Sequence, residues 1–301
     1  MPSKTLAKTS TTSGFAKDHA DRLLRNLTVQ IERTAKTAGA DEVHDLRVAI
    51  RRLGAVLKIL NDCFPVRETG KIRLALKRIM ELAGHVRDRD IAVELLTKVG
   101  GPAAAPFVVR FETQRAEAAK DLTDALAAWI AAETSTRWNN VLMRGTRIEN
   151  FSVLPIDLTA TRMLPPIADK HFKRGEKAAR EKTSPHKLHR FRIATKKFRY
   201  TLDLFAPLYG DSINPLAGGL KDIQSLLGDI NDFETVSRML SGTLSDMTPG
   251  DPSQAEDARS MIAAIEKMQR EKAAGFRAHW GQTFTPSNVR DWSAALQQVA
   301  E

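Results

Sequence analysis

The sequence has little of several features that define large classes of proteins. It contains one cysteine, Cys63, among 301 residues, so it cannot form an internal disulfide framework, and this favours a reducing compartment. No apolar run approaches the roughly 20 residues that a helix needs to cross a bilayer. Residues 1–14 lack the apolar stretch of a signal peptide. We therefore expect a cytoplasmic protein without a membrane partner.

Negative charge is also scarce, and its deficit is local. The formal net charge is +10, while the hydrophobic content of 42% is that of a soluble globular protein. Residues 161–199 hold thirteen Lys or Arg and three Asp or Glu. A concentrated positive field of this kind suits a polyanionic partner. The alternative is that the basic residues only aid solubility.

Good strand patterns are absent, and helical periodicity dominates the chain. The sequence therefore predicts an all-α fold, arranged as two tandem four-helix bundles. We expect loops at residues 100–106 and 241–254. The predicted boundaries are a disordered tail at 1–14, a first half at 15–149, a linker at 150–166 that contains Pro165 and Pro166, and a second half at 167–301.

One pattern occurs twice, 145 residues apart. The first copy reads HDLRVAIRRLGAVLKIL from His44, and the second reads HRFRIATKKFRYTLDLF from His189. A second pair of segments, LKRIMELAGHVRD from Leu76 and LKDIQSLLGDIND from Leu220, matches at nearly the same offset. Two matching blocks at one offset imply two homologous halves and a pseudo-two-fold axis. Such an axis places the two copies either facing each other or side by side.

Each copy of the histidine pattern predicts a helix with one apolar face and one basic face. The basic faces continue onto neighbouring predicted helices, where lysines and arginines again share an arc. The predicted ligand contacts in the first half are His44, Arg47, Arg51, Arg52, Lys58 and Lys77, with Arg22, Arg25 and Arg33 on the preceding helix. Those in the second half are His189, Arg192, Lys196, Lys197, Arg199, Tyr200 and Lys221, with Lys170, Arg174 and Lys177 on the preceding helix.

These motifs resemble the CHAD domain, a helical domain named for its histidines. The resemblance rests on HDLRVAIRR and HRFRIATKKFRY, each followed by an LK…LG…(R/N)D helix, and covers about residues 15–280. It implies two pseudo-symmetric four-helix bundles whose basic inner surface binds inorganic polyphosphate. Many such domains accompany a CYTH triphosphatase domain, whose ExExK signature is not found here, so the resemblance is to a stand-alone CHAD protein. Gly54 departs from the family, which usually has a basic residue there; its counterpart in the second half is Arg199.

The chemistry of the residues agrees with this resemblance. Polyphosphate is a flexible chain of negative charges without bases, so its receptor needs many Lys and Arg side chains along a path. Single-stranded nucleic acid instead favours aromatic stacking platforms, and aromatic residues make up only 6% of this chain. Tyr200 is the aromatic residue on a basic arc and could donate a hydrogen bond to phosphate. A non-sequence-specific RNA or DNA binder and a helical scaffold for an acidic protein remain alternatives.

The roles of individual matched residues stay open at this stage. His44 and His189 could contact phosphate, ligate a metal, act in catalysis, or simply satisfy a backbone carbonyl at a helix start. No HxxxH or CxxC spacing supports a metal. Lys77 and Lys221 could contact the ligand or be solvated. The matched Asp88 and Asp232 favour a salt-bridge role over ligand binding.

Enzyme signatures are missing from the sequence. It has no GxxxxGK[ST] phosphate-binding loop, no GxSxG nucleophile and no cluster of carboxylates on the basic arcs to hold Mg²⁺. We therefore expect a non-catalytic polyphosphate-binding protein, without a cofactor or a metal, that could associate with polyphosphate granules.

Overall fold

A computed structural model describes residues 10–144, 153–181, 183–246 and 252–300 of the chain. Within these ranges the structure consists of helices and one isolated β-bridge between Thr11 and Pro155, so the all-α prediction is confirmed. The first half contains α2 (Thr12–Thr37), α3 (Ala40–Ile59), η1 (Asn61–Cys63), α4 (Val66–Gly100), η2 (Gly101–Ala104), α5 (Ala105–Ala131) and α6 (Thr134–Met143). The second contains α7 (Ile156–Ala178), α8 (Pro185–Tyr209), η3 (Gly210–Ile213), α9 (Asn214–Asp246), α10 (Pro252–Thr283) and α11 (Pro286–Ala295).

The described part of each half therefore has five α-helices in the same order, where the sequence predicted four. The difference in the first half arises at Glu133, whose φ of 48° ends α5 and starts a separate helix, α6. The fifth helix of the second half is the short α11, which follows α10.

Three predicted boundaries need correction. Helix α2 already begins at Thr12, where the Thr11 hydroxyl accepts a hydrogen bond from the Gly14 amide at 3.1 Å, so the predicted tail is too long; its residues 1–9 lie outside the described residues. Helix α7 begins at Ile156 and continues through Pro165 and Pro166, although these prolines had indicated a linker. Residues 150–152 of that linker also lie outside the described residues. The loop predicted at 100–106 is helical, because α4, η2 and α5 follow one another directly. The loop predicted at 241–254 is shorter, because α9 ends at Asp246 and α10 begins at Pro252.

The prolines do not end α7 because its buried residues continue across them at helical spacing. Ile156, Ala160, Leu164 and Ala168 are all almost fully buried. Burial of such a stripe stabilises a helix by more than local propensity opposes it. Tertiary packing thus outweighs the local signal of Pro165.

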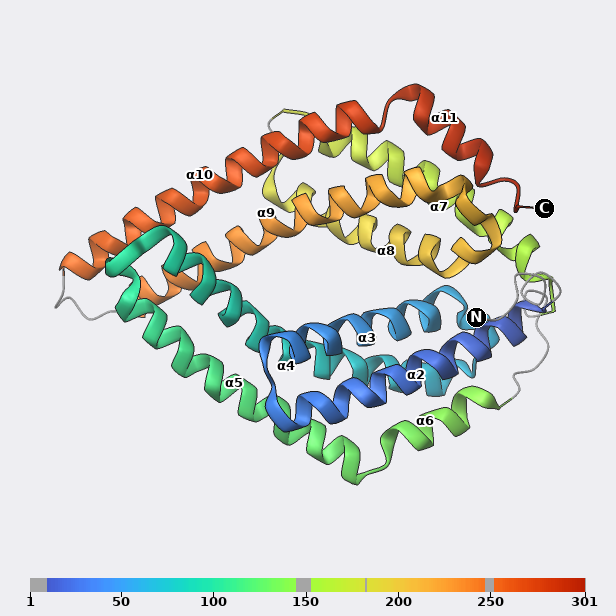
Figure 1. Cartoon of the computed structure of the whole chain (residues 1–301), viewed down its shortest axis with the longest axis horizontal. Coiled ribbons are helices and arrows are strands. Elements are labelled where there is room, and N and C mark those ends of the chain that lie inside the picture. Colours follow the sequence, from blue (N-terminus) through green and yellow to red (C-terminus); the bar gives the residue numbers. More distant parts are fainter. Residues whose placement is uncertain (1–9, 145–152, 182, 247–251, 301) are drawn as a thin grey trace.

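The hydrophobic cores of the two halves are not separate. One cluster of buried residues extends from Phe15 in α2 to Leu296 after α11. A second cluster joins the end of α4 and the start of α5 to α9 and α10; Leu96, Phe107, Val236 and Ile265 belong to it. Figure 1 shows these long helices meeting at the left end of the molecule. The halves consequently form one structural unit rather than two independent bundles.

The halves are also joined where α2 and α7 begin. The backbone amide of Thr12 donates to the carbonyl of Leu154 at 2.8 Å, and the hydroxyls of Thr12 and Thr159 are 2.6 Å apart. Both threonines are buried. The two halves are therefore connected at two places: the core shared by α4, α5, α9 and α10, and the contact where α2 and α7 begin. The histidine-bearing helices lie between these two junctions.

One segment, Val66–Ala131, is long and apolar enough for a membrane span by length and composition alone. In the structure this segment is the antiparallel pair α4 and α5, which turns back at Gly101 with a φ of 51°. Its buried residues belong to the two shared cores. The segment is therefore a helical hairpin rather than one straight helix.

The close approach of α7 and α10 at Gly175 generates a stability prediction. A Cβ atom at Gly175 would lie 1.8 Å from the ring of Trp280, whereas one at Gly275, in the middle of α10, would meet nothing within 4 Å. We expect Gly175→Ala to lower the free energy of unfolding by about 1–3 kcal/mol through overpacking. Gly275→Ala should raise it by about 0.5–1 kcal/mol, because alanine is the better helix former. Urea denaturation of both variants tests this, and equal effects would contradict the packing.

Candidate functional site

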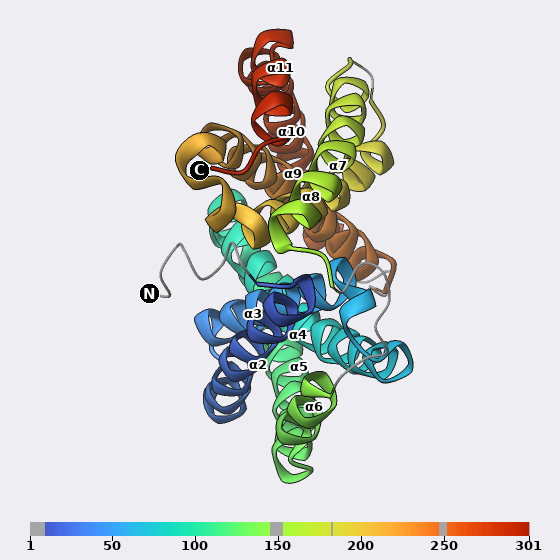
Figure 2. The same cartoon turned by 90° about the vertical axis from the view of Figure 1, so that its right-hand side faces the viewer.

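The two histidine-bearing helices, α3 and α8, contact each other along the middle of the molecule. They run in the same direction, with the first half below them and the second half above in Figure 1. The view from the end in Figure 2 shows the two halves on opposite sides of this junction. Helices α4 and α9 are in contact as well. Equivalent helices therefore meet each other, as a two-fold relation between the halves requires.

Four cationic side chains gather at this junction and form what we call the central basic cluster: Arg47 and Arg51 from α3, Arg192 and Lys196 from α8. All four are half-buried. Burial, and to a lesser degree the charges of Arg192, Arg51 and Arg47, lower the pKa of Lys196 from 10.5 to about 7. Burial also lowers the pKa values of Arg47 and Arg192. The four cations therefore repel one another in a partly desolvated space.

Two hydrogen-bond donors of the cluster have no partner among the residues that the structure describes. The Nε atoms of Arg51 and Arg192 are buried and unpaired. One Nη of Arg47 donates to the Met80 carbonyl of α4 at 3.5 Å, a long contact. A Cβ atom at Gly84 would lie 3.2 Å from that nitrogen, so a small residue there leaves room for the guanidinium. Buried donors normally have partners, and their absence here leaves capacity for an anion.

Two carboxylates flank the cluster without neutralising it. Asp88 of α4 and Asp232 of α9 are the matched aspartates of the repeat, and both raise the pKa of Arg192, Asp232 more strongly. Burial raises the pKa of Asp232, and the positive charge of Arg192 opposes this shift. Arg87 adds a fifth cation that acts on both Asp232 and Arg47. Arg87 is not among the predicted ligand contacts, and its counterpart in the second half is the uncharged Asn231.

A cavity of about 410 Å³ adjoins the cluster between α2, α3 and α8, and Arg22, Arg52, Arg199 and Tyr200 line it. The structure thus brings together four predicted residues from three helices. Arg199 lies 3.6 Å from Asp203, measured from Nε to Oδ2. This ion pair leaves part of the guanidinium for a ligand.

The two motif histidines are exposed, near the starts of α3 and α8. Nδ1 of His189 lies 3.0 Å from Oδ1 of Asn231 on α9. Because an amide oxygen only accepts, this hydrogen bond requires the tautomer with a proton on Nδ1. His44 has Arg87 at the position of Asn231. Among the described residues there is no group of three His, Cys, Asp or Glu side chains that could hold a metal.

Several predicted residues lie outside the cluster and its cavity. Arg25 pairs with Asp21, and Arg33 pairs with Glu42 at 3.4 Å and with Asp45 at 3.5 Å. These pairs reduce the positive charge of α2. Four of the predicted lysines outside α7 are exposed: Lys58 on α3, Lys77 on α4, Lys197 on α8 and Lys221 on α9. Lys77 pairs with Glu81 at 3.5 Å and lines a shallow hollow together with Gly54.

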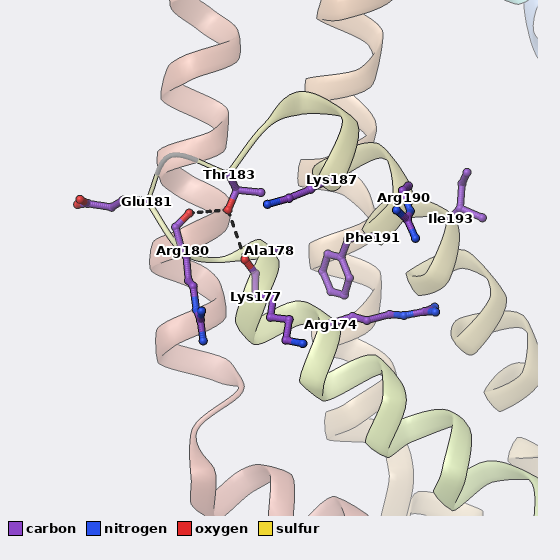
Figure 3. A pocket seen from close by; sticks show the side chains of 10 residues that line it. All are labelled: Arg174, Lys177, Ala178, Arg180, Glu181, Thr183, Lys187, Arg190, Phe191 and Ile193. Atoms are coloured by element: carbon purple, nitrogen blue, oxygen red, sulfur yellow. Dashed lines mark hydrogen bonds between the residues drawn. The ribbon is translucent and has the colours of Figure 1, made fainter.

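The predicted residues of α7 are divided. Arg174 and Lys177 line a cavity of about 640 Å³ at the corner between α7 and α8, whereas Lys170 does not. Arg180, Lys187 and Arg190 line the same cavity (Figure 3). Sequence reasoning missed these last three residues because it followed the helical phase of the matched pattern. The available signal was their place within the basic stretch 161–199.

Comparisons with known proteins agree with this architecture. A family model described as the CHAD domain matches residues 17–241. The crystal structure of the CHAD domain from the plant Ricinus communis is similar, with a TM-score of 0.68 and 17% identity over 97% of this chain and 96% of that one. PptA from Streptomyces chartreusis has a TM-score of 0.68 and 13% identity over 91% of this chain and 99% of its own. No curated protein matches the sequence significantly. At these identities the two structures show a common fold.

The repulsion within the central basic cluster predicts a pH-dependent stability. Lys196 titrates near pH 7 in the folded protein, against 10.5 for an ordinary lysine. The cost of burying its charge is therefore fully present below pH 7 and is lost as the pH rises toward 10.5. We expect Lys196→Met to be more stable than the wild type by about 1 kcal/mol at pH 7, a value reduced for solvent screening.

Urea denaturation of the ligand-free proteins at pH 7, 8 and 9 measures this difference, which should shrink as the pH rises. Lys221→Met removes an exposed lysine of α9 and serves as the control. A difference between wild type and Lys196→Met that stays constant from pH 7 to pH 9 would show that Lys196 is not the titrating group.

Proposed function

Because this chain belongs to the CHAD domain family, we propose that its central basic cluster binds inorganic polyphosphate. The observation that carries the proposal is the group of four half-buried cations where α3 meets α8, in which the Nε atoms of Arg51 and Arg192 have no partner among the described residues. A bound phosphate chain would accept hydrogen bonds from the free Nε atoms of Arg51 and Arg192. It would also neutralise the charges that lower the pKa of Lys196. Planar guanidinium groups are well suited to phosphate oxygens.

The surface favours a bare phosphate chain over single-stranded nucleic acid. None of the exposed large hydrophobic residues in the described part of the chain is aromatic, so stacking platforms for bases are scarce there. Tyr200 is half-buried beside Arg199 and can donate a hydrogen bond through its hydroxyl. The cluster offers charge and hydrogen-bond donors, which a phosphate chain can satisfy without bases.

We propose binding without catalysis. Phosphoryl transfer usually employs metal ions held by carboxylates, and the carboxylates next to the cluster, Asp88 and Asp232, lie among arginines. We propose that the protein is a polyphosphate receptor in the cytoplasm, and that polyphosphate binding recruits it to polyphosphate granules. An enzyme that used the same cluster would turn over polyphosphate, so an assay for released phosphate addresses this point.

The contact between α3 and α8 predicts that both halves form one site. Reversing charge in either half, by Arg47→Glu with Arg51→Glu or by Arg192→Glu with Lys196→Glu, should weaken polyphosphate binding about tenfold or more, because affinity for polyanions is largely electrostatic. Combining the two pairs should give less than the product of their effects, since neighbouring residues are not additive. Calorimetric titration with tripolyphosphate should give one site per chain.

A matched control removes the same total charge elsewhere. Arg259→Glu with Arg270→Glu changes two exposed arginines of α10 and should alter affinity far less. Circular dichroism verifies folding, and Arg47→Gln with Arg51→Gln replaces the reversed pair if it does not fold. Equal losses in the control and in the cluster variants would show that the binding surface is elsewhere.

Salt and competition distinguish a polyphosphate receptor from a general polyanion binder. Binding of long-chain polyphosphate should weaken steeply as salt rises, because each neutralised phosphate releases counterions. Single-stranded RNA at equal phosphate concentration should compete poorly. Equal affinities for the two polymers would reduce the function to general polyanion binding, and failure to bind polyphosphate would favour a scaffold for an acidic protein.

A further inference from the structure

The corner between α7 and α8 has a charge that its counterpart in the first half lacks. Residues 161–199 contain thirteen basic and three acidic residues, whereas the equivalent residues 16–54 contain eight and six. Lys187 and Arg190 occupy the positions that Glu42 and Asp45 occupy in the first half, counted from the motif histidines. The duplication therefore supplies an internal comparison for this corner.

In the first half the carboxylates are engaged. Glu42 and Asp45 both pair with Arg33, at 3.4 and 3.5 Å, so two carboxylates face one arginine and the group has no excess of positive charge. The connection is also short, because α2 ends at Thr37 and α3 begins at Ala40. This corner presents no surplus of cations to a ligand.

In the second half the same corner is open and cationic. The connection is longer, from Ala178 to Pro185, and beside it lies the cavity of about 640 Å³. Five cations line this cavity: Arg174, Lys177, Arg180, Lys187 and Arg190. Among the described residues none of them forms an ion pair, although nearby Lys173 pairs with Asp169 at 2.8 Å. Glu181 is the one acidic lining residue, and its side chain points away from the others in Figure 3.

Hydrogen bonds hold Thr183, which lines the cavity, against the end of α7. The Thr183 hydroxyl donates to the carbonyls of Arg180 at 2.8 Å and Lys177 at 3.3 Å, the contacts drawn in Figure 3. The start of α8 lies at the same corner, and the amide end of a helix favours negative charge. The cations therefore surround a formed recess rather than lying scattered on a flat face.

Helix α8 connects this recess with the central basic cluster. Arg190 lines the recess, whereas Arg192 and Lys196 belong to the cluster on another side of the helix. Exposed His189 and Ile193 lie on the arc between them. A flexible anion can therefore pass over the first turns of α8 from one site to the other.

We propose that the α7–α8 corner is a second anion site, present in this half alone, that holds the phosphates of a long polyphosphate chain as it leaves the central basic cluster. The inference rests on the proposed function. The corner cations then give the protein its preference for long chains, because short chains fill the central basic cluster alone and long chains occupy both sites. A long chain consequently leaves the domain on the side of the second half.

The test exchanges the corner residues of the two halves. Lys187→Glu with Arg190→Asp gives the second half the carboxylates of the first, and should weaken long-chain polyphosphate binding about tenfold or more through lost attraction and new repulsion. Binding of tripolyphosphate should stay unchanged. The reciprocal variant, Glu42→Lys with Asp45→Arg, frees Arg33 and should strengthen long-chain binding. Arg259→Glu with Arg270→Asp, on α10, matches the charge change of the first variant.

The outcomes separate this inference from the proposed function. Unchanged long-chain affinity in Lys187→Glu with Arg190→Asp, or equal losses for long and short chains, would overturn the second site while leaving polyphosphate binding intact. A loss no larger than that of the α10 control would overturn it as well. A wild-type protein that binds neither tripolyphosphate nor the long chain would instead overturn the function itself.

Discussion

Repulsion among the cations between α3 and α8 is the constraint on which the rest of the structure depends. Arg47, Arg51, Arg192 and Lys196 are half-buried at one junction, and each opposes the presence of the others. The opposite faces of the same helices supply the compensation, because Leu46, Leu53, Phe198 and Leu202 are almost completely buried there. Burial of these apolar faces keeps α3 and α8 in contact despite the repulsion between their charged faces.

The arrangement also explains why the ends of the molecule are joined so firmly. Helices α4, α5, α9 and α10 share a core at one end of the molecule. At the other end Thr12 forms hydrogen bonds with Leu154 and Thr159. Neither junction relies on the charged surface between them. The positions of the cations are therefore set by contacts that do not depend on a ligand. Such preorganisation reduces the ordering cost of binding.

The sequence predicted the features that depend on local periodicity and on duplication. The helical class and the basic face of Arg47 and Arg51 followed from residue spacing, and the match with Arg192 and Lys196 followed from the repeat. It could not decide whether the two faces meet, since docking depends on contacts between residues far apart. The inclusion of Pro165 in a helix likewise depends on tertiary packing, and no local pattern indicated the positive φ of Glu133 that separates α5 from α6. The corner at Lys187 and Arg190 escaped prediction because it arises from a difference between the halves.

The core shared by α4, α5, α9 and α10 has a consequence for the origin of the chain. A single repeat on its own would expose Leu96 and Phe107, which are buried against the other half. Two separate copies could bury them only by pairing as a symmetric homodimer. In such a dimer every change in sequence would occur twice. A single polypeptide that holds both copies is free of that restriction: Glu42 and Lys187, at equivalent positions, are opposite in charge, whereas the α3–α8 junction has cations from both copies.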